Sequence, residues 1–265
     1  MDSLEAFKAN QREAWASFAP IEQFTATTAP ELVRFARVTP GSALLDVGCG
    51  TGVVALTAAR LGAKVTGVDL TPELLTRARQ NAALMQLEVD WHVGDVEALP
   101  LPDASFDFVV SQFGHMFAPR PAVAVSEMLR VLKPGGTIAF STWPPDLFVG
   151  RWFQLLGKYG PSAPEGVSPP PQWGNPNVVR ERLGHKVRDL VFTHRLMRFP
   201  VLSVQHYRAF MEANFGPAHK LLKALDASDP VKAHALREEA EELAAQYFED
   251  NILRQDYLIA RGIKV

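Results

Sequence analysis

A glycine-rich turn carries the residue types in this sequence that are best suited to chemistry. Gly48, Gly50 and Gly52 alternate directly after an apolar run that ends in Asp46-Val47. Glycine lacks a Cβ atom and tolerates positive φ, so the backbone can bend sharply and a ligand can approach it. A helix that starts after such a turn also presents unpaired N–H groups. The pattern predicts a strand that turns into a helix at a site for a nucleoside-bearing cofactor, with an ordinary tight turn as the alternative.

The spacing of these glycines argues against a dinucleotide. Val53 stands where the dinucleotide-binding fingerprint has its third glycine, so no close seat for a pyrophosphate is predicted. Asp69 ends the next predicted strand, at about the distance where a carboxylate accepts hydrogen bonds from ribose hydroxyls. An acid at a helix N-terminus is the other interpretation, and the two roles are compatible. The pattern therefore disfavours NAD and FAD among nucleoside cofactors.

Composition places the chain among ordinary soluble globular proteins. It has 265 residues, of which 47% are apolar and 21% are charged, and its formal net charge is −2. No basic excess indicates a surface for nucleic acid or for an anionic membrane, so neither partner is predicted. The acidic start and the lack of a long apolar stretch predict neither a signal peptide nor an integral membrane segment. The cytoplasm is therefore the expected location.

Cysteine and histidine usage limits the metal chemistry. Cys49 is the only cysteine, which excludes an internal disulfide and a zinc site built from several thiolates. It lies inside the glycine turn, where a small buried filler is favoured over a reactive thiol. The histidines show no metal-ligand spacing, and no carboxylates cluster with them. We therefore predict no metal.

The elements that position these residues alternate along the chain. We predict strands at 43–47, 64–68, 89–93, 106–110, 137–141, 188–195 and 257–260. Helices are predicted at 53–61, 72–85, 122–132, 204–215 and 220–248, after two or three helices that precede residue 38. Strands that alternate with helices predict an α/β fold with a doubly wound sheet. Ligands bind such sheets beyond the carboxyl ends of the strands, where the glycine turn lies.

A single domain that spans residues 1–265 is the predicted organisation. Its parts are N-terminal helices at 1–40, a cofactor-binding core at 41–143, lid insertions at 144–186 and 200–250, and closing strands at 187–199 and 252–265. The stretch 144–176 is rich in proline and interleaved with aromatic residues. We predict a long loop there that forms a lid or a wall, with a solvated surface excursion as the alternative.

An ordered series of motifs gives the chain a family resemblance. The motifs are Leu45–Gly52, Gly67-Val68-Asp69, Gly94–Pro100, Phe106-Asp107 and Leu132–Gly136. Together they resemble those of class I S-adenosylmethionine-dependent methyltransferases, and more narrowly the small-molecule group related to quinone-biosynthesis methyltransferases. The match covers about residues 43–141. With it we expect a Rossmann-like, mostly parallel seven-stranded sheet whose last strand is antiparallel, S-adenosylmethionine as the methyl donor and S-adenosylhomocysteine as the product.

The resemblance also implies contacts with the cofactor. Asp95 would contact the adenine amino group through its carboxylate, and the backbone of Val96 would contact the ring. Asp46 would either anchor N–H groups of the turn or interact with the ammonium group of the cofactor, and structural support is the favoured role. The residues predicted to bind the cofactor are Asp46, Gly48, Gly50, Gly52, Asp69, Leu70, Asp95, Val96, Ser111 and Gln112.

His115 is the candidate catalytic residue. Methyl transfer from a sulfonium is an in-line displacement that needs alignment and exclusion of water, so no side-chain nucleophile is expected. The resemblance places the methionine end of the cofactor and the mouth for the acceptor at 110–117. His115 lies in this segment, and its usual pKa makes it a candidate general base for a hydroxyl or an amine. A histidine that only packs or makes a hydrogen bond is the alternative.

Aromatic residues at helical spacing are candidates for the wall of an acceptor site. Trp15 and Phe18 could close over the cofactor from an N-terminal helix. One face of a later predicted helix carries Tyr207, Phe210, Asn214 and Phe215. Packing in the core is the alternative for both groups.

These observations predict methyl transfer to an oxygen, nitrogen or carbon atom of a small organic acceptor, beneath a lid formed by 144–186 and 200–250. One alternative is a non-catalytic protein that binds S-adenosylmethionine and regulates a partner. A dehydrogenase is the other, and the missing third glycine disfavours it.

Overall fold

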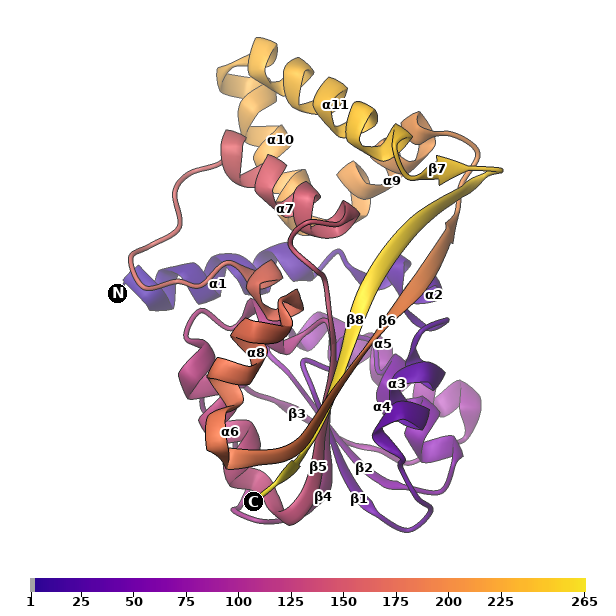
Figure 1. The fold of residues 1–265 in the computed structure, drawn as a ribbon. Helices are drawn as coiled ribbons and strands as arrows, with labels where there is room; N and C mark the ends of the chain where they lie inside the picture. The colour runs from indigo at the N-terminus through magenta and orange to yellow at the C-terminus, as the bar shows by residue number, and fades with distance from the viewer. Residues whose placement is uncertain (1–2) are drawn as a thin grey trace.

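A central sheet with helices on both faces forms the body of the protein (Figure 1). The computed structural model describes residues 3–265. Its strands are β1 (Ala43–Val47), β2 (Lys64–Asp69), β3 (Asp90–Val93), β4 (Phe106–Gln112), β5 (Leu132–Thr142), β6 (Val187–Pro200), β7 (Phe248–Glu249) and β8 (Ile252–Lys264). They are ordered β3-β2-β1-β4-β5-β8-β6, and β7 pairs with β8 beside this path. Strands β1 to β5 pair in parallel, whereas β8 is antiparallel to both β5 and β6.

The predicted Rossmann-like sheet with an antiparallel last strand is confirmed, with one addition. The seven predicted strands correspond to β1–β6 and β8, whereas β7 was not predicted. A strand of two residues has no alternation of polar and apolar side chains by which to recognise it. Strands β6 and β8 extend beyond the segments 188–195 and 257–260 that periodicity indicates, to bounds close to those of the expected closing strands, because they remain paired as far as Pro200 and Ile252.

Helices cover both faces of the sheet, with α3 and α4 on one face and α6 and α8 on the other (Figure 1). The α-helices are α1 (Ser3–Trp15), α2 (Glu22–Thr25), α3 (Ala29–Ala36), α4 (Val53–Arg60), α5 (Pro72–Met85), α6 (Pro121–Val131), α7 (Phe148–Tyr159), α8 (Pro176–Leu183), α9 (Val204–Asn214), α10 (Gly216–Ser228) and α11 (Pro230–Ala245). Short 3-10 helices are η1 (Ala19–Ile21), η2 (His115–Phe117), η3 (Pro170–Gly174) and η4 (Gly184–Lys186). Because both faces are covered, central strands are continuously apolar, as in Leu44, Leu45 and Val47 of β1, which are all buried.

Four helices form a cap over the carboxyl end of the sheet (Figure 1). They are α7, α9, α10 and α11, and they enclose a second apolar core that includes Phe148, Leu222, Leu236 and Leu253. Helix α1 packs beneath the cap against α10. A Cβ atom on Gly216 would lie 1.6 Å from the carbonyl oxygen of Ala14, so the two helices touch through their backbones. The cap and α1 together therefore close the space above the sheet.

Two predictions about the lid segments were wrong. Phe148–Tyr159 was expected to be part of a loop but forms α7. Its apolar residues Phe148, Trp152 and Leu156 recur every fourth position and are buried, a helical signal that the surrounding prolines obscured. The helix expected at 220–248 is two helices, because Asp229 caps α11 by accepting a hydrogen bond from the N–H group of Lys232 (3.1 Å) and Pro230 begins the new helix.

Two further features concern the described residues alone. No helix within residues 3–265 has the length and apolar character needed to cross a bilayer. The same residues contain no group of three or more histidine, cysteine or acidic side chains arranged to hold a metal ion.

Cys49 is buried, and burial together with the charges of Asp69 and Asp46 raises the pKa of its thiol. This environment suits a packing residue better than a reactive thiolate.

Candidate active site

The glycine turn joins β1 to α4 at the carboxyl end of the sheet. Gly48, Gly50 and Gly52 all have positive φ, between +54° and +85°, so a left-handed backbone is required at each. A Cβ atom on Gly48 would lie 2.8 Å from the Cα atom of Gly114. The backbone of the turn therefore packs directly against the backbone of the segment that follows β4. A Cβ atom on Gly50 would meet no atom within 4 Å, because the space beside Gly50 opens into a cavity.

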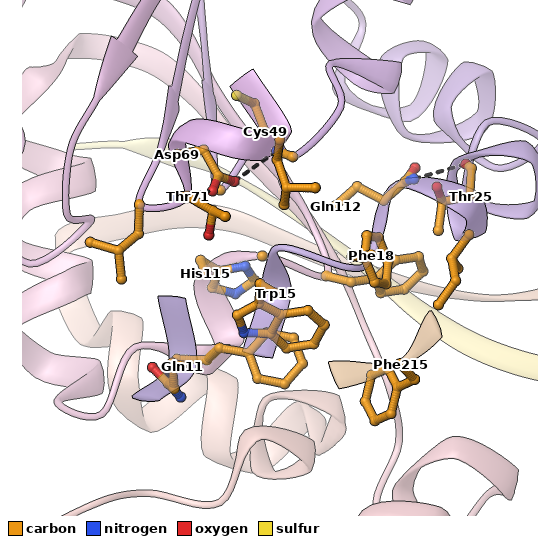
Figure 2. A pocket seen from close by; sticks show the side chains of 18 of the residues that line it. Gln11, Trp15, Phe18, Thr25, Cys49, Asp69, Thr71, Gln112, His115 and Phe215 are labelled. Carbon is orange, nitrogen blue, oxygen red and sulfur yellow. Dashed lines mark hydrogen bonds between the residues drawn. The ribbon is translucent and has the colours of Figure 1, made fainter. Parts of the chain in front are cut away.

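Asp69 holds the glycine turn in place (Figure 2). One carboxylate oxygen accepts a hydrogen bond from the N–H group of Gly50 (2.7 Å), and the other accepts one from the N–H group of Thr71 (2.8 Å). Burial is the main cause of the raised pKa of Asp69, and these backbone bonds counteract it. Asp69 and Leu70 line the cavity. Since a carboxylate offers about four acceptor positions, Asp69 retains capacity for a ligand.

Asp46 supports the fold instead of lining the cavity. Its Oδ2 atom accepts a hydrogen bond from the N–H group of Ala55 (3.0 Å) in α4, while Oδ1 has no partner among residues 3–265. The side chain is buried, and this burial raises its pKa to about 8. Gly52 likewise lies outside the lining and is the N-cap residue that precedes α4. The favoured structural role of Asp46 agrees with this geometry.

The loop after β3 is joined to α1 by a partly buried ionic cluster in which Glu97 is the buried member. Asp95 and Glu97 both accept hydrogen bonds from Nζ of Lys8, and Glu97 is also paired with Arg120. Asp95 and Val96, the predicted adenine contacts, line the cavity together with Lys8. The sequence did not predict Lys8 as a residue of this site, because a single lysine that is 87 residues away from Asp95 gives no local signal. The N-terminal helix is thereby fastened at the end of the cavity where adenine is expected.

Ser111 and Gln112 at the end of β4 differ in their access to the cavity. The Ser111 hydroxyl donates a hydrogen bond to the carbonyl oxygen of Val47 (2.6 Å) and accepts one from the N–H group of His115 (3.0 Å). Ser111 is buried and does not line the cavity, so its hydroxyl connects two backbone segments. Gln112 lines the cavity and donates to the carbonyl oxygen of Thr25 (2.9 Å). Its Oε1 atom has no partner among the described residues.

His115 lines the cavity as a neutral imidazole. Its ring packs against Phe140 and Trp173, with centroid distances of 4.5 Å and 4.6 Å. Neither ring nitrogen has a partner within residues 3–265. Burial first, and then the charge of Arg182, lower the pKa of His115 to about 3. The ring can therefore accept a hydrogen bond at neutral pH but is a weak proton acceptor, and its catalytic role stays a prediction.

Aromatic side chains form the wall of the cavity between the glycine turn and the cap. Trp15, Phe18 and Phe215 all line it (Figure 2). Further aromatic residues of the lining are Phe113, Phe117, Trp143, Trp152, Phe153, Phe199 and Tyr207. Of the predicted face on α9, Tyr207 lines the cavity, whereas Phe210 does not line it and packs against Phe24 and Phe199. Asn214 also lies outside and donates to the carbonyl oxygen of Phe210.

Comparisons with known proteins identify the family. A family model described as a methyltransferase domain matches residues 45–140. The uncharacterized protein Rv1405c of Mycobacterium tuberculosis is 35% identical over 98% of this chain and 96% of its own length. A malonyl-[acyl-carrier protein] O-methyltransferase of Serratia marcescens is 41% identical, over 39% of each chain. The chain belongs to the S-adenosylmethionine-dependent methyltransferases. This methyltransferase therefore uses S-adenosylmethionine as its cofactor and transfers its methyl group.

Solved structures agree on the fold of this methyltransferase. A putative methyltransferase of Bacillus halodurans superposes with a TM-score of 0.61 at 21% identity, covering 90% of this chain and 99% of that one. The YcgJ protein of Bacillus subtilis gives a TM-score of 0.60 at 19% identity, covering 90% and 98%. The open space beside Gly50 and the spare acceptor positions of Asp69 fit a nucleoside in the cavity.

Replacement of Asp69 by alanine is expected to weaken binding of S-adenosylmethionine about 5- to 150-fold, because a charged acceptor and the anchor of Gly50 are both lost. Isothermal titration calorimetry measures this change. Asp107→Ala is the matched control, since Asp107 also accepts a backbone hydrogen bond, from Ala43 (2.8 Å), but does not line the cavity. An unchanged affinity in a folded Asp69→Ala variant would remove Asp69 from the cofactor site.

Proposed function

We propose that this methyltransferase acts on a small, neutral and largely apolar organic acceptor, at an oxygen, nitrogen or carbon atom. The observation that carries the proposal is the distribution of charge along the cavity. Among residues 3–265, the charged side chains of the lining are Lys8, Asp69 and Asp95, and the sequence motifs assign the two acids to the nucleoside of the donor. The remaining lining is mostly aromatic and aliphatic. A charged acceptor would lose its hydration there without gaining an ionic partner.

The residues of the chain divide between holding the donor and orienting the acceptor. Bound S-adenosylmethionine supplies a methyl group activated by a sulfonium. Gly48, Gly50, Asp69, Leu70 and Val96 would hold its nucleoside and methionine parts beside the end of β1. In this proposal the glycine turn leaves room for the donor, and Asp69 keeps the turn in shape.

The acceptor would lie where unpaired polar atoms meet the apolar lining. A ring nitrogen of His115 can accept a hydrogen bond, which suits a hydroxyl group on the methyl-accepting substrate. Gln112 offers its unpaired Oε1 atom, and Trp152 offers its unpaired indole N–H group. Trp15 and Phe18 would exclude water during the displacement. These features support a methyl-accepting substrate with an apolar skeleton that carries at least one hydrogen-bond donor and one oxygen atom.

Replacement of Trp152 by phenylalanine is expected to raise the KM for the acceptor about 2- to 10-fold with little change in kcat, because one hydrogen bond in ground-state binding is lost. Trp173→Phe is the matched control. Its indole nitrogen is also buried without a partner, but Trp173 does not line the cavity. Steady-state kinetics distinguishes the two variants, and an equal change in both would argue against an acceptor contact at Trp152.

A panel of acceptors tests the proposed function. Formation of S-adenosylhomocysteine is measured with hydroxylated or amino-substituted aromatic compounds and with carboxylated analogues that share the same ring. We expect turnover with neutral members and a large loss with the charged analogues. Preference for the charged analogues would contradict the proposal. Binding of S-adenosylmethionine without turnover of any acceptor would favour the non-catalytic alternative, and calorimetric preference for NAD would contradict the family assignment.

A further inference from the structure

A second cleft lies beside α3, apart from the methyl-transfer cavity. It forms where the C-terminal turn of α3 meets β6 and β8, and its volume is about 380 Å³. Its lining residues are Glu31, Arg34, Phe35, Arg37, Arg195 and Arg261. None of these residues lines the methyl-transfer cavity. Four guanidinium groups from three elements therefore face one concave surface in a chain whose formal net charge is −2.

The single carboxylate of this cleft is already engaged. Oε2 of Glu31 accepts a hydrogen bond from the Tyr257 hydroxyl (3.0 Å) and pairs with Nε of Arg195 (3.2 Å). Arg34 and Arg37 are exposed, and the structure shows no side-chain hydrogen bond or ion pair for either among residues 3–265. The cleft thus keeps a formal excess of three positive charges. Unpaired like charges held this close repel one another, and a bound anion would relieve the repulsion.

Arg261 is the least exposed of the four arginines in this cleft. It donates a hydrogen bond through Nη1 to the carbonyl oxygen of Phe35 (3.2 Å), and its guanidinium lies 5.5 Å from the centre of the Phe35 ring. Its Nε atom is buried without a partner in the described residues. Burial and the neighbouring charge of Arg37 lower the pKa of Arg261. An acceptor oxygen from a ligand would satisfy this group and oppose both effects.

Stabilisation of the C-terminus of α3 explains the presence of only some of the four arginines in this cleft. Cations favour helix C-termini, and the bond from Arg261 to Phe35 is an example. That bond uses one of the five donors of one arginine. The donors of Arg34 and Arg37 are left without acceptors in the part of the chain that the structure describes. An additional acceptor of high charge is therefore the better explanation for four arginines around one cleft.

We propose that this cleft is a binding site for a small phosphoryl anion, of the pyrophosphate or phosphate-ester class, separate from the methyl-transfer site. Guanidinium groups bind phosphoryl oxygens through paired N–H donors, and several arginines around one anion match its charge. The concave shape suits a small molecule better than an extended polymer. The proposal does not depend on the identity of the methyl acceptor.

Calorimetric titration with pyrophosphate at constant ionic strength tests the site. We expect saturable binding to the unmodified protein and at least a tenfold loss in the double variant Arg34→Gln/Arg37→Gln. The matched control is Arg198→Gln/Arg254→Gln, which removes the same charge from exposed positions of β6 and β8 outside the cleft. This control is expected to bind pyrophosphate within twofold of the unmodified protein.

Three results with pyrophosphate would overturn the proposal. They are the absence of saturable binding to the unmodified protein, an equal loss in the two double variants, and competition between pyrophosphate and S-adenosylmethionine. Succinate at the same ionic strength tests the chemical class, because equally tight binding of this dicarboxylate would contradict a phosphoryl site. The affinity for S-adenosylmethionine should be unchanged in both double variants, which also verifies that they are folded.

Discussion

Replacing Gly48 by alanine is expected to lower the free energy of unfolding by about 2–5 kcal/mol and to abolish measurable binding of S-adenosylmethionine. The left-handed conformation alone costs about 1–2 kcal/mol for a residue with a Cβ atom, and overpacking adds about 1–3 kcal/mol. The new Cβ atom would lie 2.8 Å from Cα of Gly114 and 3.1 Å from its carbonyl carbon. Both neighbours are backbone atoms, so no side chain can move aside.

Alanine substitutions at two other glycines separate the cost of the left-handed backbone from the cost of overpacking and from the loss of cofactor binding. Gly135 has a φ of +77°, a Cβ atom there would meet nothing within 4 Å, and the residue does not line the cavity. Gly135→Ala should therefore show only the conformational cost and normal cofactor binding. Gly50→Ala should show a similar small loss of stability with weakened binding, because its Cβ atom would enter the cavity. Chemical denaturation and calorimetry measure the two effects, and equal stability losses at Gly48 and Gly135 would contradict the proposed backbone contact.

Replacing Asp46 by asparagine is expected to make stability less sensitive to pH. Because the folded-state pKa of Asp46 is raised to about 8 from 3.8, folding binds a proton between these values. The contribution of Asp46 to stability is therefore fully present below pH 4 and is lost as the pH rises toward and through 8. Linkage gives a slope of about 1.4 kcal/mol per pH unit, on the order of 5 kcal/mol across the window. Asparagine keeps the shape of the side chain and cannot ionise.

The measured quantity is the difference in unfolding free energy between Asp46→Asn and the unmodified protein, from pH 5 to pH 8.5. We expect the variant to gain stability relative to the unmodified protein as the pH rises. His115 does not contribute to this difference, because both proteins contain it. Asp107→Asn is the control, since Lys133 lowers the pKa of Asp107 and its difference should be flat over this range. A flat difference for Asp46→Asn as well would show that Asp46 is ionised in the folded protein.

Predictions from sequence succeeded where the interacting groups are close along the chain. Gly50 and Asp69 are 19 residues apart in one βαβ unit, so the order of strand, turn, helix and strand brings them together. The motif spacing therefore located the turn, and the regular alternation predicted the parallel sheet. In contrast, Lys8 reaches Asp95 across 87 residues, and Gln112 reaches Thr25 across 87 residues. No periodic pattern in the sequence predicts which residues so far apart will form hydrogen bonds.

The properties of His115 show why local sequence is not enough. Its position near the end of β4 was predicted, but its low pKa results from burial against Phe140 and Trp173 and from the charge of Arg182. These residues come from β5, η3 and α8, far along the chain. Proton affinity depends on the sum of all surrounding groups, so a candidate general base in sequence became a buried neutral imidazole in the fold.

The sequence by itself determined the geometry of the glycine turn, the proposed donor site, because this turn and its bond to Asp69 depend on backbone conformation and on neighbouring elements. Only the tertiary structure decided the character of the cavity proposed for the methyl acceptor, which combines Trp15 of α1, Trp152 of α7 and Tyr207 of α9. It also decided the arginine cleft, where α3, β6 and β8 bring four charges together. Burial and charge density arise when distant segments pack, and the spacing of residues along a chain does not specify which segments will meet.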